Sequence, residues 1–223
     1  MDSLQFENQL AEHIDSVFRH HQELNDHREI HPWLTGSLGD PFSGIWFVGE
    51  NPSLRMVERA SNSSGIPLTK EAQWAESRGD CLFREALVRY GFKDGCVDSP
   101  GGWHCYITNV MKEADYTHRV REKSPESRQE MANLWLPVLK WELEHSDPHI
   151  VVAMGGQVFD LLTYLHSFAA LKLPCILKMT HYAYVGQRAR GHQGPMHPER
   201  VQEYYAEMAN IARKHNELSK TSK

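Results

Sequence analysis

The sequence predicts an α/β fold, a single domain in which a central four-stranded parallel sheet lies between layers of helices. Short apolar runs of the kind that form buried strands alternate with longer stretches whose apolar residues recur at helical spacing. Glycine, proline and serine stand at the junctions, where turns and helix ends require them. We expect one domain over residues 1–223, with an N-terminal helix and connection in residues 1–40 and a frayed tail over 218–223.

The first half of the chain begins with an amphipathic pattern and contains the first apolar runs. Residues 3–24 carry apolar side chains at helical spacing opposite a polar face, and Ile45–Val48 is a short apolar run. Ser53 is placed to cap a short helix, and Gly91 supplies the usual stop for another. In chain order we expect a helix over 3–24, a connection over 26–40, a strand over 45–48, a helix over 54–60, a loop over 61–65, a helix over 81–90 and a strand over 103–108.

The second half of the chain continues the alternation. Ser124 as N-cap and Pro125 at the first helical position mark the start of a long helix. Gly155–Gly156 marks the turn between the strand that follows and the next helix. In chain order we expect a helix from 125 to about 145, a strand over 149–154, a helix from 156 to about 165, a strand over 175–179 and a helix over 198–215. Strands and helices that alternate in this way predict a parallel sheet covered on both faces.

Composition argues against several classes of protein. No stretch approaches the roughly 20 apolar residues of a membrane span, and the start of the chain lacks the regions of a secretory signal. The four cysteines form no CxxC pair, and none of the 14 histidines has HExxH-like spacing. We therefore expect a cytoplasmic protein with no membrane association, no metal and no cofactor. The net charge of −5 disfavours bulk nucleic-acid binding, but residues 178–200 hold four basic residues against one acid, so a local basic face stays open.

Polar residues follow several of the predicted strands. Gly49-Glu50-Asn51-Pro52-Ser53 comes directly after the first strand, Asn109 follows the second, and Thr180-His181-Tyr182 follows the last. In an open α/β sheet, ligands bind at the carboxyl ends of the strands. Glu50 and Asn51 can each hold or activate a water there, while Pro52 stiffens the loop. A structural reading stays open beside this one, because Asn109 and His181 can also serve only to bond the backbone of their turns.

Together these segments resemble the uracil-DNA glycosylase superfamily, closest in layout to its bacterial and archaeal iron–sulfur class. The resemblance runs from about Gly44 to the final helix. In family order, the matching segments are 49–53, 78–82, 106–112, 124–126, 135–136, 148–155 and 180–184. The resemblance implies a monomeric enzyme that flips a base out of DNA and hydrolyses its N-glycosidic bond without a cofactor.

The resemblance also implies roles for single residues. Asn51 orients the attacking water, and Glu50 is a second, electrostatic candidate for that step. Asn109 reads the base edge, since a carboxamide offers both a donor and an acceptor. His181 lies near O2 of the base, where a donor stabilises the departing anion. Further positions are expected at the base (Gly49, Pro52, Leu68 and Trp74) and at DNA (Tyr182, Tyr184, Arg188 and Arg190).

The chain departs from the iron–sulfur class at several positions. Glu113 stands where that class has a cysteine and no N-terminal cysteine pair exists, so we expect no cluster. Leu68 replaces a base-stacking phenylalanine, so three alternatives stay open: Trp74 supplies the stacking, Phe83 supplies it, or it is lost. Tyr182 follows His181 where the family has proline, and a His-Pro pair occurs only later, at His197.

Three functions stay open on the sequence. The first is a DNA glycosylase acting on uracil or another deaminated or modified base. The second is a catalytically weak relative that binds damaged DNA. The third is a hydrolase or transferase for free nucleosides or nucleotides, which would need no contact with DNA. Base release from DNA separates the first from the second, and turnover of a free nucleoside identifies the third.

Overall fold

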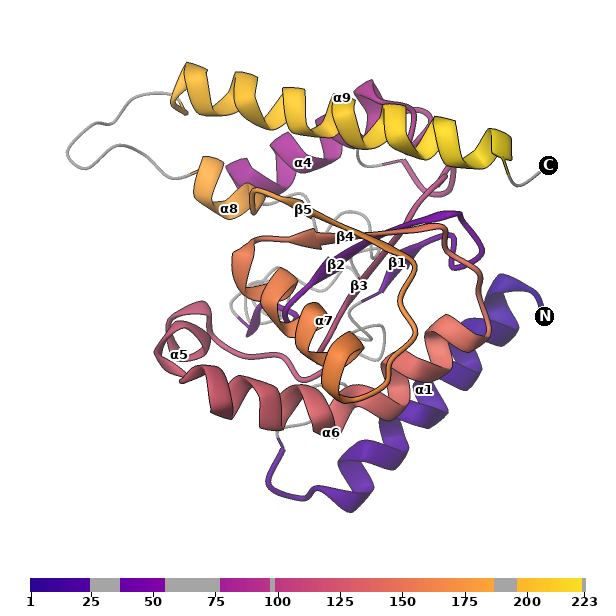
Figure 1. Cartoon of the computed structure of the whole chain (residues 1–223), viewed down its shortest axis with the longest axis vertical. Coiled ribbons are helices and arrows are strands. Elements are labelled where there is room, and N and C mark those ends of the chain that lie inside the picture. Colours follow the sequence, from indigo (N-terminus) through magenta and orange to yellow (C-terminus); the bar gives the residue numbers. More distant parts are fainter. Residues whose placement is uncertain (25–36, 55–76, 97–98, 187–195, 222–223) are drawn as a thin grey trace, which may run out of the picture.

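The structure, a computed structural model, describes residues 1–24, 37–54, 77–96, 99–186 and 196–221. Its centre is a five-stranded sheet with the order β1-β3-β2-β4-β5 (Figure 1). The strands are β1 (Leu38–Gly39), β2 (Ile45–Gly49), β3 (Tyr106–Asn109), β4 (Ile150–Met154) and β5 (Cys175–Met179). The last four pair in parallel, whereas β1 runs antiparallel to β3. The predicted α/β class is therefore confirmed.

The expected number of strands is wrong by one, because β1 lies in the segment 26–40 that we predicted as a connection. Its two residues pair with β3, with Leu38 opposite Ile107. So short a strand carries no alternating pattern of its own. Its extended form comes from the neighbouring strand that offers it hydrogen bonds.

Helices cover both faces of the sheet. Helices α1 (Ser3–His20), α6 (Pro125–Glu144) and α7 (Gly156–Phe168) share one apolar core with the sheet, and α4 (Arg78–Arg89), α8 (Tyr182–Val185) and α9 (Pro198–Thr221) share another (Figure 1). Along β2 the side chains alternate between them: Trp46 enters the first core and Phe47 the second. This two-sided burial explains why the strand is a continuous apolar run.

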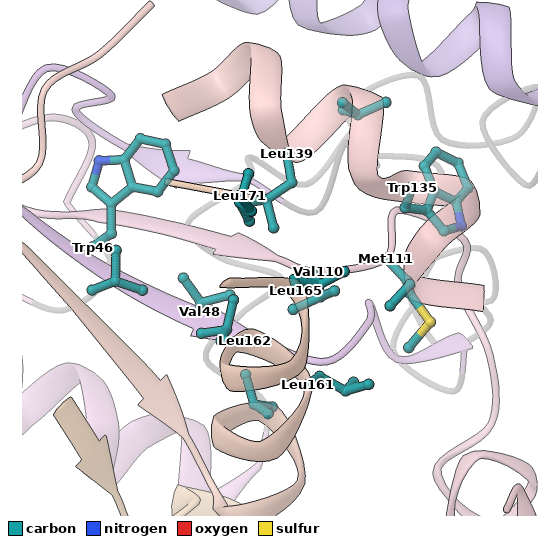
Figure 2. Close-up of a cluster of buried hydrophobic side chains, with 14 of the residues drawn as sticks. Trp46, Val48, Val110, Met111, Trp135, Leu139, Leu161, Leu162, Leu165 and Leu171 are labelled. Carbon is teal, nitrogen blue, oxygen red and sulfur yellow. The ribbon is translucent and has the colours of Figure 1, made fainter. Parts of the chain in front are cut away.

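The first core reaches the turn that follows β3. Val110 and Met111 lie in it together with Trp135 of α6 and Leu165 of α7 (Figure 2). All four are at most 2% exposed. Because Val110 and Met111 are packed in this way, the backbone directly after Asn109, at the carboxyl end of β3, is fixed.

Helix ends differ from the expectations where side chains decide them. The long helix begins as predicted, with Ser124 as N-cap and Pro125 in the first turn. Helix α4 begins at Arg78 rather than at residue 81, because the Ser77 hydroxyl accepts the Asp80 N–H and caps it earlier. Helix α9 continues to Thr221, so residues 218–221 are helical where we expected a frayed tail.

Two short helices were not predicted. Helix α5 (Thr117–Glu122) precedes α6, and α8 follows β5, where the sequence predicted no helix. Of the helix predicted over 54–60, all but Leu54 lies outside the described residues, as does the loop predicted over 61–65. No helix in the described ranges is long and apolar enough to cross a bilayer.

Candidate active site

The chain segments that follow β2 and β3 are joined beyond the end of the sheet. Backbone hydrogen bonds continue between the two segments after the strands end, as far as a parallel bridge between Ser53 and Asp115. The bonds run from Val110 N to Gly49 O (2.9 Å), Met111 N to Glu50 O (2.9 Å), Asp115 N to Pro52 O (3.1 Å) and Leu54 N to Asp115 O (3.0 Å). The first two polar segments of the sequence analysis are thus held side by side in a fixed register.

Gly49 and Asn109 are the last paired residues of β2 and β3, and they face each other directly. A Cβ placed on Gly49 would clash with Oδ1 of Asn109. The absence of a side chain at Gly49 is what lets the Asn109 amide lie across the end of β2. Asn109 is buried, with 4% exposure.

Glu50 pairs with an arginine from α6. Its Oε1 lies 3.5 Å from Nε of Arg128, and the two side chains are 12% and 8% exposed. Arg128 is held in turn by α5, because its Nη2 donates to the carbonyl of Val120 at 2.6 Å. Burial raises the pKa of the Glu50 carboxyl, and the charges of Arg128 and then Lys123 oppose that shift.

Asn51 has its amide oriented by its own turn. Nδ2 donates to the carbonyl of Pro52 at 3.1 Å. With the nitrogen engaged, Oδ1 is the acceptor that the amide presents, and among the described residues nothing donates to it. The side chain is half-buried, beside the buried Pro52.

His181 is the N-cap of α8, two residues beyond β5. Its Nδ1 accepts the N–H of Ala183 at 3.1 Å. A ring nitrogen that accepts carries no proton, so the neutral imidazole has its proton on Nε2 and is a donor there. Its Cβ lies against Gly155, which follows β4 and has φ of 103°. Since β2 to β5 are parallel, His181 belongs to the same edge of the sheet as Asn51 and Asn109.

A family model described as the uracil DNA glycosylase superfamily matches residues 37–209. The chain belongs to the uracil DNA glycosylase superfamily. The match includes the joined segments after β2 and β3 and the histidine after β5, and it confirms the family that the sequence resembles. Members of this superfamily are typically DNA glycosylases, hydrolases that act on DNA. None of the curated proteins compared matches the chain.

In this superfamily member, the aromatic residues near His181 divide into inward and outward groups. The Tyr182 ring stacks on Phe83 of α4, with centroids 5.2 Å apart and planes at 6°. Phe83 is only 1% exposed, so the alternative that it stacks on a base is wrong. Tyr184, in contrast, is 49% exposed, and the Arg200 guanidinium lies 4.6 Å from its ring centre. Of the two tyrosines expected at DNA, only Tyr184 presents its ring outward.

Four of the expected site residues, Leu68, Trp74, Arg188 and Arg190, lie outside the described residues. His197 directly precedes α9, and its carbonyl accepts the N–H of Val201 at 3.1 Å, as expected of a residue at a helix start. Within the described ranges, no group of three His, Cys, Asp or Glu side chains is arranged to hold a metal ion. Glu113, at the place of a cluster cysteine in the iron–sulfur class, is buried.

Sequence reasoning missed the residues that hold the site. Arg128 pairs with Glu50 across 78 positions of the chain, and Glu207 of α9 binds the residue before His181. No local pattern marks either residue.

Proposed function

We propose that the protein is a DNA glycosylase that hydrolyses the N-glycosidic bond of uracil, or of another deaminated or modified base, flipped out of DNA. The observation that carries the proposal is the convergence of Asn51, Asn109 and His181 at one edge of the sheet, in a chain of this superfamily. Each of these groups suits one part of the reaction.

We assign activation of the attacking water to the segment after β2. Oδ1 of Asn51 accepts a hydrogen bond from the attacking water and directs its oxygen to C1′ of the sugar. The carboxyl of Glu50 is paired with Arg128, which suits it to stabilise positive charge on the sugar rather than to take a proton directly. The bond from C1′ to the base nitrogen breaks and its electron pair stays on the base. The water oxygen bonds to C1′, and the proton that it loses passes to solvent and from there to the departing base anion.

The base-holding part is proposed for Asn109 and His181. The Asn109 carboxamide offers a donor and an acceptor, which matches the O4 and N3–H edge of uracil. His181, with its proton on Nε2, donates to O2 as negative charge develops on the leaving base.

The DNA-facing part is proposed for the surface around α8. Tyr184 is exposed beside the catalytic edge, and Arg200 lies over its ring. An aromatic ring can fill the space that the flipped base leaves, and an arginine beside it can reach phosphate. Phosphate contacts by Arg188 and Arg190 are part of the same proposal, and the enzyme is proposed to act as a monomer.

The experiment is base release from labelled oligonucleotides containing uracil, hypoxanthine, xanthine or hydroxymethyluracil, single-stranded and paired, followed by alkali cleavage at abasic sites. We expect release of at least one base, and loss of release with near-normal DNA binding in the variant combining Asn51→Ala with Glu50→Ala. Silence across the panel with binding retained would favour a damaged-DNA binder. Turnover of free nucleosides without DNA affinity would favour a nucleoside hydrolase.

A further inference from the structure

The residue before His181 is fastened to the C-terminal helix. Glu207 of α9 accepts two hydrogen bonds from Thr180, one from the backbone N–H at 2.7 Å and one from the hydroxyl at 2.8 Å. A carboxylate that accepts from both groups of one residue fixes that residue's backbone as well as its side chain.

The residue after His181 is fastened to a different helix. The Tyr182 hydroxyl lies close to the carboxylate of Asp80 in the first turn of α4, and the Tyr182 ring stacks on Phe83 one turn later. Asp80 is 8% exposed and is itself held by Ser77, whose hydroxyl donates to its carboxylate at 2.5 Å. Burial raises the pKa of both partners, Asp80 and Tyr182.

The backbones of α4 and α8 touch beneath these side chains. A Cβ on Gly79 would lie 2.7 Å from the carbonyl oxygen of Tyr182, and a Cβ on Gly186 would lie 2.8 Å from the nitrogen of Gly79. Both helices therefore meet in a register that larger residues would not permit. The four-residue α8 is too short to be stable alone, so these contacts decide where it lies.

We propose that Tyr182 and Glu207 are positioning residues that hold the His181 imidazole where the departing base needs its donor. The family places a proline after this histidine, which stiffens the backbone from within. In this chain two sets of contacts hold the same backbone: Tyr182 packs on Phe83 beside Asp80 of α4, and Thr180 is hydrogen-bonded to Glu207 of α9. The inference rests on the proposed function, since the action of His181 on a leaving base is part of that proposal.

The kinetic test uses substitutions that remove one polar contact and keep the size and shape of the side chain. Tyr182→Phe removes the hydroxyl that meets Asp80 and keeps the ring on Phe83; Glu207→Gln removes one of two acceptor oxygens. We expect each to lower kcat about tenfold with little change in KM, because a donor displaced by a fraction of an ångström loses most of its effect on the transition state. Tyr205→Phe and Glu203→Gln, on the same helix α9 but away from Thr180 and Tyr182, are the matched controls and should leave kcat unchanged.

A double-mutant comparison separates positioning from general damage. In a His181→Ala background, Tyr182→Phe should cause no further loss, because the residue it positions is gone. An equal fractional loss in both backgrounds would overturn the proposal and mark Tyr182 as merely structural.

A spectroscopic readout keeps the test independent of activity. The 15N resonances of the His181 ring, assigned by their loss in His181→Gln, should report the Nε2-protonated tautomer in the unsubstituted protein. They should shift in Tyr182→Phe and in Glu207→Gln, and stay in place in both controls. Unmoved His181 resonances in a folded Tyr182→Phe variant would refute the positioning role. If the protein releases no base at all, the proposed function fails while these resonances still decide whether Tyr182 holds His181.

Discussion

At the scale of single residues, the least expected feature is the carboxyl of Glu50. It follows a glycine turn at the edge of a sheet, where a solvated carboxylate would be ordinary, yet it is largely buried against Arg128. Burial favours the protonated acid and the arginine favours the carboxylate, and the burial effect is the larger of the two. The ionisation of Glu50 therefore depends on one neighbour from a distant helix.

Arg128→Met is expected to raise the pKa of Glu50 further, because the largest opposing charge is lost. If the ionised carboxylate supports catalysis, activity falls as pH drops through that pKa, so the acid limb of the kcat profile should move to higher pH. Lys123→Met should move the limb less, since Lys123 is the weaker influence and is already paired with Asp115 at 3.0 Å. A pH–rate profile of the three proteins checks this. A limb that persists unchanged in Glu50→Gln would show that another group titrates.

At the scale of elements, β3 is joined to α6 by a buried polar network behind the site. The Glu142 carboxylate accepts from the hydroxyls of Tyr106 and Thr108, each at 2.9 Å, and pairs with Nζ of Lys112 at 2.7 Å. The lysine and glutamate side chains are fully buried. Burial lowers the pKa of Lys112, and Glu142 opposes that shift, so each charge is tolerated because of the other.

Lys112→Met is expected to destabilise the protein by about 3–5 kcal/mol, because it leaves the Glu142 charge buried without its counter-ion. Adding Glu142→Gln should recover part of that loss, since the amide oxygen still accepts from Tyr106 and Thr108 while the charge is gone. Denaturant unfolding measures all three proteins. Lys140→Met is the control on α6, because its pair with Glu144 is exposed and about 0–1 kcal/mol is expected. If Lys112→Met and Lys140→Met lower the free energy of unfolding equally, the buried pair contributes no more to stability than the exposed one.

Elements with strong local signals were predictable, and those defined by distant partners were not. The Ser124-Pro125 start of α6 and the apolar runs of β2, β4 and β5 are local features, and they hold in the structure. Strand β1 exists only because β3 pairs with it, and α8 exists where α4 and α9 support it. The site divides in the same way: residues at strand ends could be named from the sequence, whereas their holders, Arg128 and Glu207, come from far along the chain.

At the scale of the whole molecule, α9 connects the two ends of the sheet. Near its middle Glu207 binds Thr180 at the carboxyl edge of the strands, and further along His215 lies by Gly44 and His149, which precede β2 and β4. Between them, Met208 and Ile211 are at most 4% exposed in the second core. A change that destabilises α9 at His215 therefore acts on a helix that also binds Thr180, the residue before His181.

His215 is expected to make the protein sensitive to mild acid. Burial lowers its pKa below the ordinary 6.5, and the nearby His149 lowers it further. A group with a depressed pKa in the folded state binds its proton better when unfolded, so its contribution to stability is complete above 6.5 and is lost as pH falls toward the folded pKa. The melting temperature should therefore fall more steeply between about pH 7 and pH 5 in the unsubstituted protein than in His215→Leu. His20→Leu, at an exposed position on α1, is the control and should leave that slope unchanged. If the melting temperature falls equally steeply with pH in the unsubstituted protein and in His215→Leu, then His215 is not the cause of the acid sensitivity.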